Sequence, residues 1–276
     1  MLRSPEVRPP AVAGTFYPLG TSQLRRMVDD MLAQVDAEPA AAIAAIAPHA
    51  GLVYSGQCAA HVWKRVQIPD TVVILAPNHT GASNNPGGAS AWNRGAFKTP
   101  FGEVSIATDF LAEVEKRCTL VCHDPVAHSR EHAIEVQLPF LQTLAPQAAL
   151  APIVIAWDRW DASVKLATAL AESIAEHAGD VLLVSSSDMT HYESAADAER
   201  KDRGVLDAIE QLDGERLLDV CHRENVTMCG RAPSAIVVET ARQLGATKAE
   251  VVDYRHSGWV TGDDSSVVAY AGVVMN

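Results

Sequence analysis

The stretch TVVILAPNHTG (residues 71–81) is a β-branched apolar run that breaks into a loop holding His79 and a glycine. The same pattern recurs in two further stretches, AIAPHAGLVYSG (45–56) with His49 and VLLVSSSDMTHY (181–192) with His191. Open α/β sheets build their active sites where strands end, so the three histidines are predicted to line one polar pocket. Imidazoles gathered in one pocket are typical of a metal site.

Strands and helices are expected to alternate along the whole chain. The apolar patterns place strands at 42–47, 71–76, 119–123, 149–155, 181–186, 249–255 and 265–274, and helices at 21–37, 56–66, 108–116, 130–144, 161–177, 193–219 and 232–244. This order, without a linker, favours a single three-layer α/β domain with a central mixed sheet over residues 1–276. Residues 1–20 are rich in proline and glycine, and are expected to form an irregular arm on the surface or toward a partner subunit.

Two segments carry specific local expectations. Residues 80–104 are rich in Gly, Asn, Ser and Pro, and are expected to form a long loop beside the pocket, with room for short strands. The helix at 130–144 is expected to have Ser129 as its N-cap and to kink or tighten at Pro139, which cannot donate a backbone hydrogen bond.

The composition argues against several classes of protein. With 48% hydrophobic and 20% charged residues, the chain is typical of a globular protein. A net charge of -12 argues against a nucleic-acid partner, because phosphate contacts need Lys and Arg. No apolar run approaches the roughly 20 residues that span a bilayer, and the N-terminus does not resemble a signal peptide, so no membrane is expected and the cytoplasm is the expected location. Five cysteines without a CxxC pair fit a reducing compartment.

The context of each histidine suggests a role. A proline shortly before His49 and His79 and a glycine shortly after them make the backbone stiff on one side and open on the other. That combination suits a ligand site, and the alternative is an ordinary surface-loop histidine. Asp188 can orient His191 and raise its pKa, which suits a general acid or base, or it can cap the following turn.

Cys229 lies just before a helix that Pro233 can open. A helix N-terminus lowers the pKa of a thiol, which suits a metal ligand or a nucleophile, and the alternative is a buried structural cysteine. His128 and His132 are four residues apart, but they resemble a zinc pair only weakly because the HExxH pattern is absent. The helix also carries further polar groups, which are expected to support the ligands or to cap the helix: Glu131, His132, Glu135 and Gln137.

Six motifs in order together resemble the Memo family. They are AVAGTFYP (11–18), APHAGLVYSG (47–56), APNHTG (76–81), EHAIEVQLPFLQ (131–142), SSSDMTHY (185–192) and MCG (228–230). The resemblance implies the fold of the class III extradiol dioxygenases, in which one α/β domain carries a metal at the ends of sheet strands. It also implies that His49, His79 and Cys229 hold the metal. Asp188 and His191 would line the same site, with His191 as its acid or base.

The resemblance leads to three hypotheses on function. The dioxygenases use two histidines and a carboxylate, and a cysteine in place of the carboxylate favours copper(I), iron or zinc over a hard ferrous centre. The first hypothesis is a metal-binding protein with one copper or iron ion, zinc being a further choice, and a redox role. The second is a non-haem iron oxygenase, and the third is a peptide-binding or scaffold protein. The pocket is accordingly expected to take a small molecule or a peptide, and each hypothesis allows an oligomer.

Overall fold

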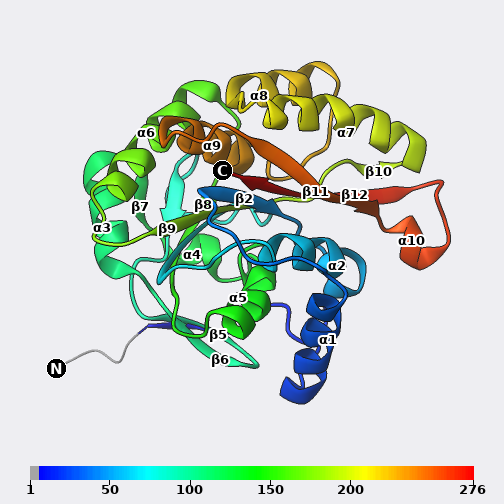
Figure 1. Cartoon of the computed structure of the whole chain (residues 1–276). Coiled ribbons are helices and arrows are strands. Elements are labelled where there is room, and N and C mark those ends of the chain that lie inside the picture. Colours follow the sequence, from blue (N-terminus) through cyan, green and yellow to red (C-terminus); the bar gives the residue numbers. More distant parts are fainter. Residues whose placement is uncertain (1–5) are drawn as a thin grey trace.

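A mixed sheet of nine strands lies between two layers of helices (Figure 1). The structure is a computed structural model that describes residues 6–276. Strands of the large sheet are β2 (Ala44–Ala47), β3 (Thr71–Pro77), β4 (Ala89–Ala91), β7 (Val121–His123), β8 (Ala149–Ile155), β9 (Val181–Ser186), β10 (His191–Glu193), β11 (Ala249–His256) and β12 (Val267–Met275). They follow the order β10-β12-β2-β9-β3-β8-β4-β7, and β11 pairs with β12.

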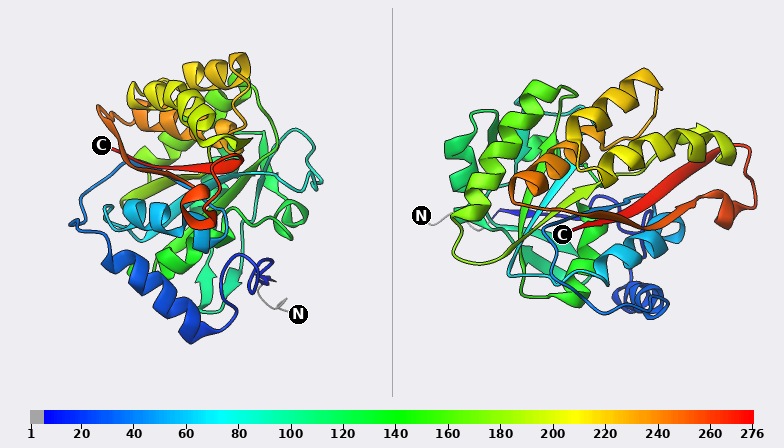
Figure 2. Two further views of the ribbon diagram at one scale, coloured as in Figure 1. Left: turned by 90° about the vertical axis from the view of Figure 1, so that its right-hand side faces the viewer. Right: turned by 45° about the horizontal axis from the view of Figure 1, so that its top comes forward.

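The helices pack on both faces of this sheet. They are α1 (Thr21–Ala33), α2 (Leu52–Trp63), α3 (Thr108–Arg117), α4 (Pro125–His128), α5 (Leu138–Leu144), α6 (Trp160–Ala175), α7 (Ala195–Glu210), α8 (Gly214–Arg223), α9 (Arg231–Gln243) and α10 (Gly258–Thr261). Helices α6 to α9 lie on one face, whereas α1, α2 and α5 lie on the other (Figure 1 and Figure 2). The expected α/β fold with a central mixed sheet is therefore confirmed.

The centre of the sheet is parallel and buried. Helices cover both faces of the sheet, so side chains on both faces of the central strands are buried. Strands β2, β3 and β9 are therefore mainly apolar along their length, up to the serines that end β9. Ala47 pairs with Ser186, and Leu75 pairs with Ser185, so the three strands end at nearly the same level. The loops that follow them therefore meet at one edge of the sheet, as predicted.

The helix expected at 130–144 is wrong in its first half. Ser129 ends α4 instead of capping a new helix, and a turn precedes the short 3₁₀ helix η1 (Glu135–Gln137) and then α5. The buried carboxylate of Glu131 accepts the backbone N–H groups of the two residues after it, which stabilises this turn. Pro139 lies in the first turn of α5, where its missing N–H costs nothing, so it does not kink this helix, and the tightening lies just before it in the 3₁₀ helix η1.

Other boundaries differ in ways that the side chains explain. The helix expected at 193–219 is divided into α7 and α8, because Leu212 has a left-handed backbone with φ 55° and the Asp213 side chain caps α8 by accepting the N–H of Arg216. The loop expected at 80–104 does contain short strands, as the sequence allowed: β4, β5 (Ala96–Thr99) and β6 (Gly102–Ser105). The helix expected at 56–66 begins earlier, at Leu52.

The N-terminal arm is anchored inside the protein. Its strand β1 (Val7–Arg8) pairs with β5 in a small three-stranded sheet, and Arg8 is only 1% exposed. Arg8 Nη1 lies 2.5 Å from Glu135 Oε2, and the Tyr17 hydroxyl donates to Glu135 Oε1 at 2.5 Å. The expected surface position is thus wrong for the part of the arm around Arg8 and Tyr17, because these polar groups satisfy a buried carboxylate. Residues 1–5 of the arm lie outside the described residues.

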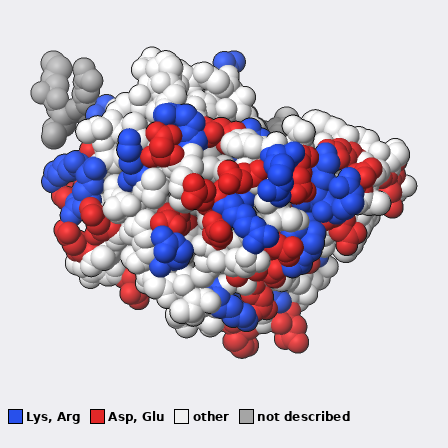
Figure 3. Space-filling view, turned by 90° about the horizontal axis from the view of Figure 1, so that it is seen from above, with Lys and Arg blue, Asp and Glu red and all other residues white. Residues whose placement is uncertain are grey.

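The exposed faces carry mixed charge. Over α7 and α8, basic and acidic side chains are interspersed, with no extended basic patch on the face that Figure 3 shows. Ion pairs such as Arg203 with Asp207 and Arg200 with Asp197 account for part of this pattern. None of the helices within residues 6–276 is both long enough and apolar enough to cross a membrane.

The buried ion pair of the arm gives a stability prediction. Because Arg8→Met leaves the Glu135 carboxylate buried without its counter-ion, we expect the free energy of unfolding to fall by about 3–5 kcal/mol. Arg94→Met is the matched control, since Arg94 pairs with Glu6 of the arm at 3.2 Å but is 58% exposed, and should cost about 0–1 kcal/mol. Urea unfolding monitored by circular dichroism measures both. Equal losses in the two variants would contradict the anchoring role of Arg8.

Candidate metal centre

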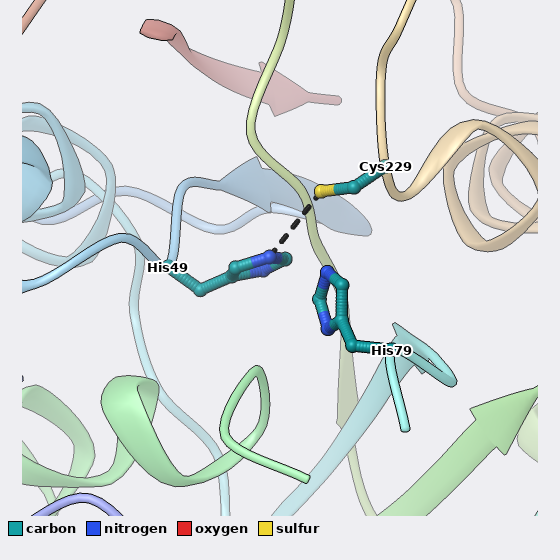
Figure 4. Close-up of side chains that lie close together, drawn as sticks. All are labelled: His49, His79 and Cys229. Atoms are coloured by element: carbon teal, nitrogen blue, oxygen red, sulfur yellow. Dashed lines mark hydrogen bonds between the residues drawn. The ribbon is translucent and has the colours of Figure 1, made fainter. Parts of the chain in front are cut away.

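Three side chains that the sequence predicts as metal ligands converge at the edge of the sheet. His49 follows β2, His79 follows β3, and Cys229 precedes α9. One ligand atom of each lies within 4.8 Å of those of the other two. Figure 4 shows the two imidazole rings and the sulfur directed toward one another. Metal ligation stays a prediction, but the geometry required for it is present.

His49 is held on both sides of its ring. Its Nδ1 lies 2.9 Å from Ser186 Oγ at the end of β9, and its Nε2 lies 3.3 Å from Cys229 Sγ. The backbone N–H of His49 donates to Asp188 Oδ1 at 2.7 Å, and the N–H of Ala50 donates to the same oxygen at 3.2 Å. The loop and the ring of this 1% exposed histidine are therefore both fixed by groups from the neighbouring strand.

His79 is oriented by a buried carboxylate. Its Nδ1 lies 2.9 Å from Glu131 Oε1, and its backbone N–H donates to Glu131 Oε2 at 2.7 Å. Glu131 is 2% exposed, and its Oε1 also accepts the N–H groups of His132 and Ala133. This arrangement leaves Nε2 of His79 free, and a carboxylate on the far nitrogen is the usual support of a metal-bound histidine.

Cys229 approaches the strand ends because the next residue is a glycine. A Cβ atom on Gly230 would lie 2.5 Å from Ser187 Cβ and 2.8 Å from the Ser186 carbonyl oxygen, so any side chain there would push the loop away. The Gly230 N–H donates to Ser187 Oγ at 2.9 Å, and the Asp188 N–H donates to Cys229 Sγ at 3.3 Å. The sulfur therefore accepts one backbone N–H, and as a thiol it also donates toward the Asp188 carbonyl oxygen at 3.7 Å.

Burial dominates the electrostatics of the site. Burial, and then the charge of His79, lowers the pKa of His49 to about 3. Burial and the Asp188 carboxylate raise the pKa of the Cys229 thiol, so the expected lowering by a helix N-terminus is wrong for the cation-free chain. Although burial opposes it, the hydrogen bond and charge of His79 lower the pKa of Glu131 to about 2. A neutral imidazole and thiol therefore lie near ionised Glu131, and a cation would be stabilised there.

Asp188 contacts the backbone of the His49 loop, and His191 is held through its own backbone. The Asp188 carboxylate accepts the backbone N–H groups of the His49 loop, and no hydrogen bond within residues 6–276 joins it to the His191 ring. The His191 backbone N–H donates to Thr227 Oγ1 at 2.7 Å, and its buried Nδ1 lacks a partner in the described chain. Orientation of His191 by Asp188 and proton transfer by His191 both stay predictions.

His132 contributes more to the site than its sequence context indicates. Its ring stacks on His79 with centroids 4.5 Å apart, and lies edge-on to His49 at 5.4 Å. Phe16 of the arm packs against it at 4.7 Å. His79, Glu131 and His132 also form a second set whose ligand atoms lie within 4.8 Å of one another. By contrast, His128 is buried elsewhere, with Nε2 at 2.8 Å from the Ser90 carbonyl oxygen.

A cleft gives access to the candidate ligands. It has a volume of about 650 Å³, and its walls include His79, Cys229, Trp157 and Arg231. It lies between the loops that follow β3 and β8 and the start of α9. A larger cavity of about 750 Å³ lies at the opposite, amino ends of the parallel strands, next to Ile43 and Val181, and contains none of the candidate residues.

Comparison with known proteins agrees with the motifs. A family model described as Memo-like protein matches residues 8–274. A MEMO1 family protein of Aquifex aeolicus (strain VF5) is 41% identical to this chain over 97% of it and 98% of the relative. MEMO1 family proteins of Methanopyrus kandleri and Methanosarcina acetivorans are each 36% identical, over 97% and 98% of this chain and 98% and 99% of their own lengths. The chain therefore belongs to the Memo family.

Proposed function

We propose that this chain is a metal-binding protein that holds one copper or iron ion through His49, His79 and Cys229. The observation that carries the proposal is the convergence of their three ligand atoms within 4.8 Å. The far nitrogen of each imidazole already has a partner, Ser186 for His49 and Glu131 for His79, so the other nitrogen is left for a metal. A metal-bound histidine usually has such a hydrogen-bond partner on its other ring nitrogen, whereas histidines that lie together by chance need not.

The donor set favours particular metals. Two imidazole nitrogens and one thiolate form a softer set than the two histidines and one carboxylate of the dioxygenases. Such a set suits copper(I), iron or zinc, and copper or iron would supply one-electron redox chemistry when bound. The nearby Glu131 carboxylate, whose pKa is lowered against the effect of burial, mainly by its hydrogen bond to His79, adds negative charge that offsets a cation.

The residues that line the cleft indicate what kind of molecule the site would bind. Because His79 and Cys229 form part of its wall, a small molecule or the side chain of a peptide within it would approach the metal directly. Apolar groups such as Met228 and Pro233 line the cleft together with Arg231, and such a mixture suits a ligand of intermediate polarity. His191, close to the same ligands, is our candidate for carrying a proton to or from such a molecule.

A non-haem iron oxygenase is the second candidate function, and one observation favours it. His79, Glu131 and His132 reproduce the two-histidine, one-carboxylate composition of a ferrous site. However, Glu131 already accepts four N–H groups, from His79 twice and from His132 and Ala133, so metal binding there would break existing hydrogen bonds. Binding at the set with Cys229 leaves these four bonds intact and replaces the 3.3 Å contact between His49 Nε2 and Cys229 Sγ, which are themselves ligand atoms, so this set is preferred.

Removal of the candidate thiolate tests the proposed function. Wild-type protein purified under reducing conditions should contain about one copper or iron ion per chain, and Cys229→Ala should lose it because a third of the donor set is gone. Cys122→Ala, which removes an exposed thiol, is the control and should keep the wild-type metal content. Elemental analysis by plasma mass spectrometry measures all three. Full occupancy in Cys229→Ala would rule out this ligand set.

Loss of the carboxylate behind His79 should weaken binding without abolishing it. Glu131→Gln removes the charge that holds the His79 ring, and we expect the dissociation constant for Zn²⁺ or Co²⁺ to rise about 10–100-fold. Glu239→Gln is the matched control, since Glu239 is also buried but pairs with Arg242 far from the site. Competition with a chromophoric chelator gives the affinities. Similar dissociation constants for both variants would show that Glu131 has no part in binding.

A further inference from the structure

A buried chain of hydrogen bonds runs from the end of α2 to His49. Trp63 Nε1 donates to Gln137 Oε1 at 2.8 Å, and Gln137 Nε2 donates to Ser186 Oγ at 2.8 Å. Ser186 Oγ donates to the Ala133 carbonyl oxygen at 2.7 Å and lies 2.9 Å from His49 Nδ1. Each of the four side chains is at most 1% exposed, so water cannot substitute for any partner.

The donors and acceptors of this chain can be assigned from its two ends. An indole N–H only donates, so the Gln137 oxygen must face Trp63 and the Gln137 amide nitrogen must face Ser186. The same nitrogen lies 2.9 Å from the Pro48 carbonyl oxygen, which only accepts and therefore requires the same orientation. The amide of Gln137 is thus oriented by groups that allow no alternative.

The single hydroxyl proton of Ser186 decides the next step. The Ala133 carbonyl oxygen only accepts and lies 2.7 Å from Ser186 Oγ, where two oxygens without a proton between them would repel, so this proton is directed to Ala133. Gln137 Nε2 already donates to Ser186 Oγ, and the remaining lone pair of that oxygen faces His49 Nδ1. Only a protonated Nδ1 of His49 can donate a hydrogen bond to this lone pair of Ser186 Oγ. The proton of neutral His49 therefore lies on Nδ1, and Nε2 carries the lone pair.

We propose that Gln137 and Ser186 are positioning residues that hold His49 in the tautomer protonated at Nδ1, so that its Nε2 lone pair faces Cys229 Sγ. The sulfur is 3.3 Å from that nitrogen. Without the chain of hydrogen bonds, the other tautomer could place its proton between Nε2 and the sulfur, where it would occupy the lone pair that a metal needs. The tautomer is a property of the metal-free chain, and only its effect on affinity rests on the proposed function.

The two serines at the end of β9 provide a matched test. Ser186 contacts His49, whereas Ser185 is equally buried and its Oγ lies 2.8 Å from Ser234 Oγ, away from the site. Long-range ¹H–¹⁵N correlation spectra of the metal-free protein report the tautomer of His49, whose signals are assigned by their loss in His49→Asn. We expect the Nδ1-protonated form alone in the wild type and in Ser185→Ala. Ser186→Ala should show a mixture of tautomers, and Ser186→Thr, which keeps the hydroxyl, should restore the single form.

Zn²⁺ titrations of the same proteins separate the two proposals. Ser186→Ala should bind about 10–100-fold more weakly than the wild type, with Ser185→Ala and Ser186→Thr close to wild type. A wild-type His49 protonated at Nε2, or the same tautomer and affinity in Ser186→Ala and Ser185→Ala, would overturn the positioning role. The wild-type spectrum decides this even if Ser186→Ala does not fold. Should the spectra match our expectation while no protein binds metal, the tautomer assignment would stand and the proposed function would fail.

Discussion

One short segment, residues 131–137, forms hydrogen bonds to the arm, to the strand ends and to the candidate ligands. The polar groups of the segment that form them are buried, and buried polar groups must be hydrogen-bonded. Glu131 holds His79, the Ala133 carbonyl oxygen accepts from Ser186, Glu135 binds the arm, and Gln137 orients Ser186. Glu131, Glu135 and Gln137 are each at most 2% exposed. Because none of these side chains can form hydrogen bonds with bulk water instead, a substitution of one of them would disturb a strand end, the arm or a candidate ligand.

Much of the fold follows from the apolar pattern. The parallel strands are uninterrupted apolar runs, and each ends at a change to proline, serine or polar residues, so the sequence alone predicts where the loops meet. The apolar pattern wrongly predicted an α-helix at residues 130–137. The apolar spacing there resembles that of a helix, but the glutamate side chains point into the protein. Inward carboxylates cannot be recognised before their partners are known, and the main partners of Glu135, Arg8 and Tyr17, lie more than 110 residues away in the chain.

The sequence indicates the candidate ligands and part of their support, since Glu131 was expected beside them and holds His79. His49 and His79 stand out as strand-end histidines, and Cys229 is recognisable mainly through the family motif. The role of Ser186 and the particular partners of Gln137 depend on hydrogen bonds across the sheet edge, which a local sequence pattern does not reveal. The contacts of Asp188 were not predictable either, since its carboxylate accepts the buried N–H groups of the His49 loop, which begins 139 residues away in the chain.

The central claim is that His49, His79 and Cys229 bind one metal ion together. The most direct measurement is anomalous diffraction from crystals of the metal-loaded protein, recorded on both sides of the absorption edge of copper or iron. We predict one anomalous peak per chain within bonding distance of both histidine Nε2 atoms and the cysteine sulfur. A peak between His79, Glu131 and His132, or no peak at this edge of the sheet in fully loaded crystals, would contradict the account.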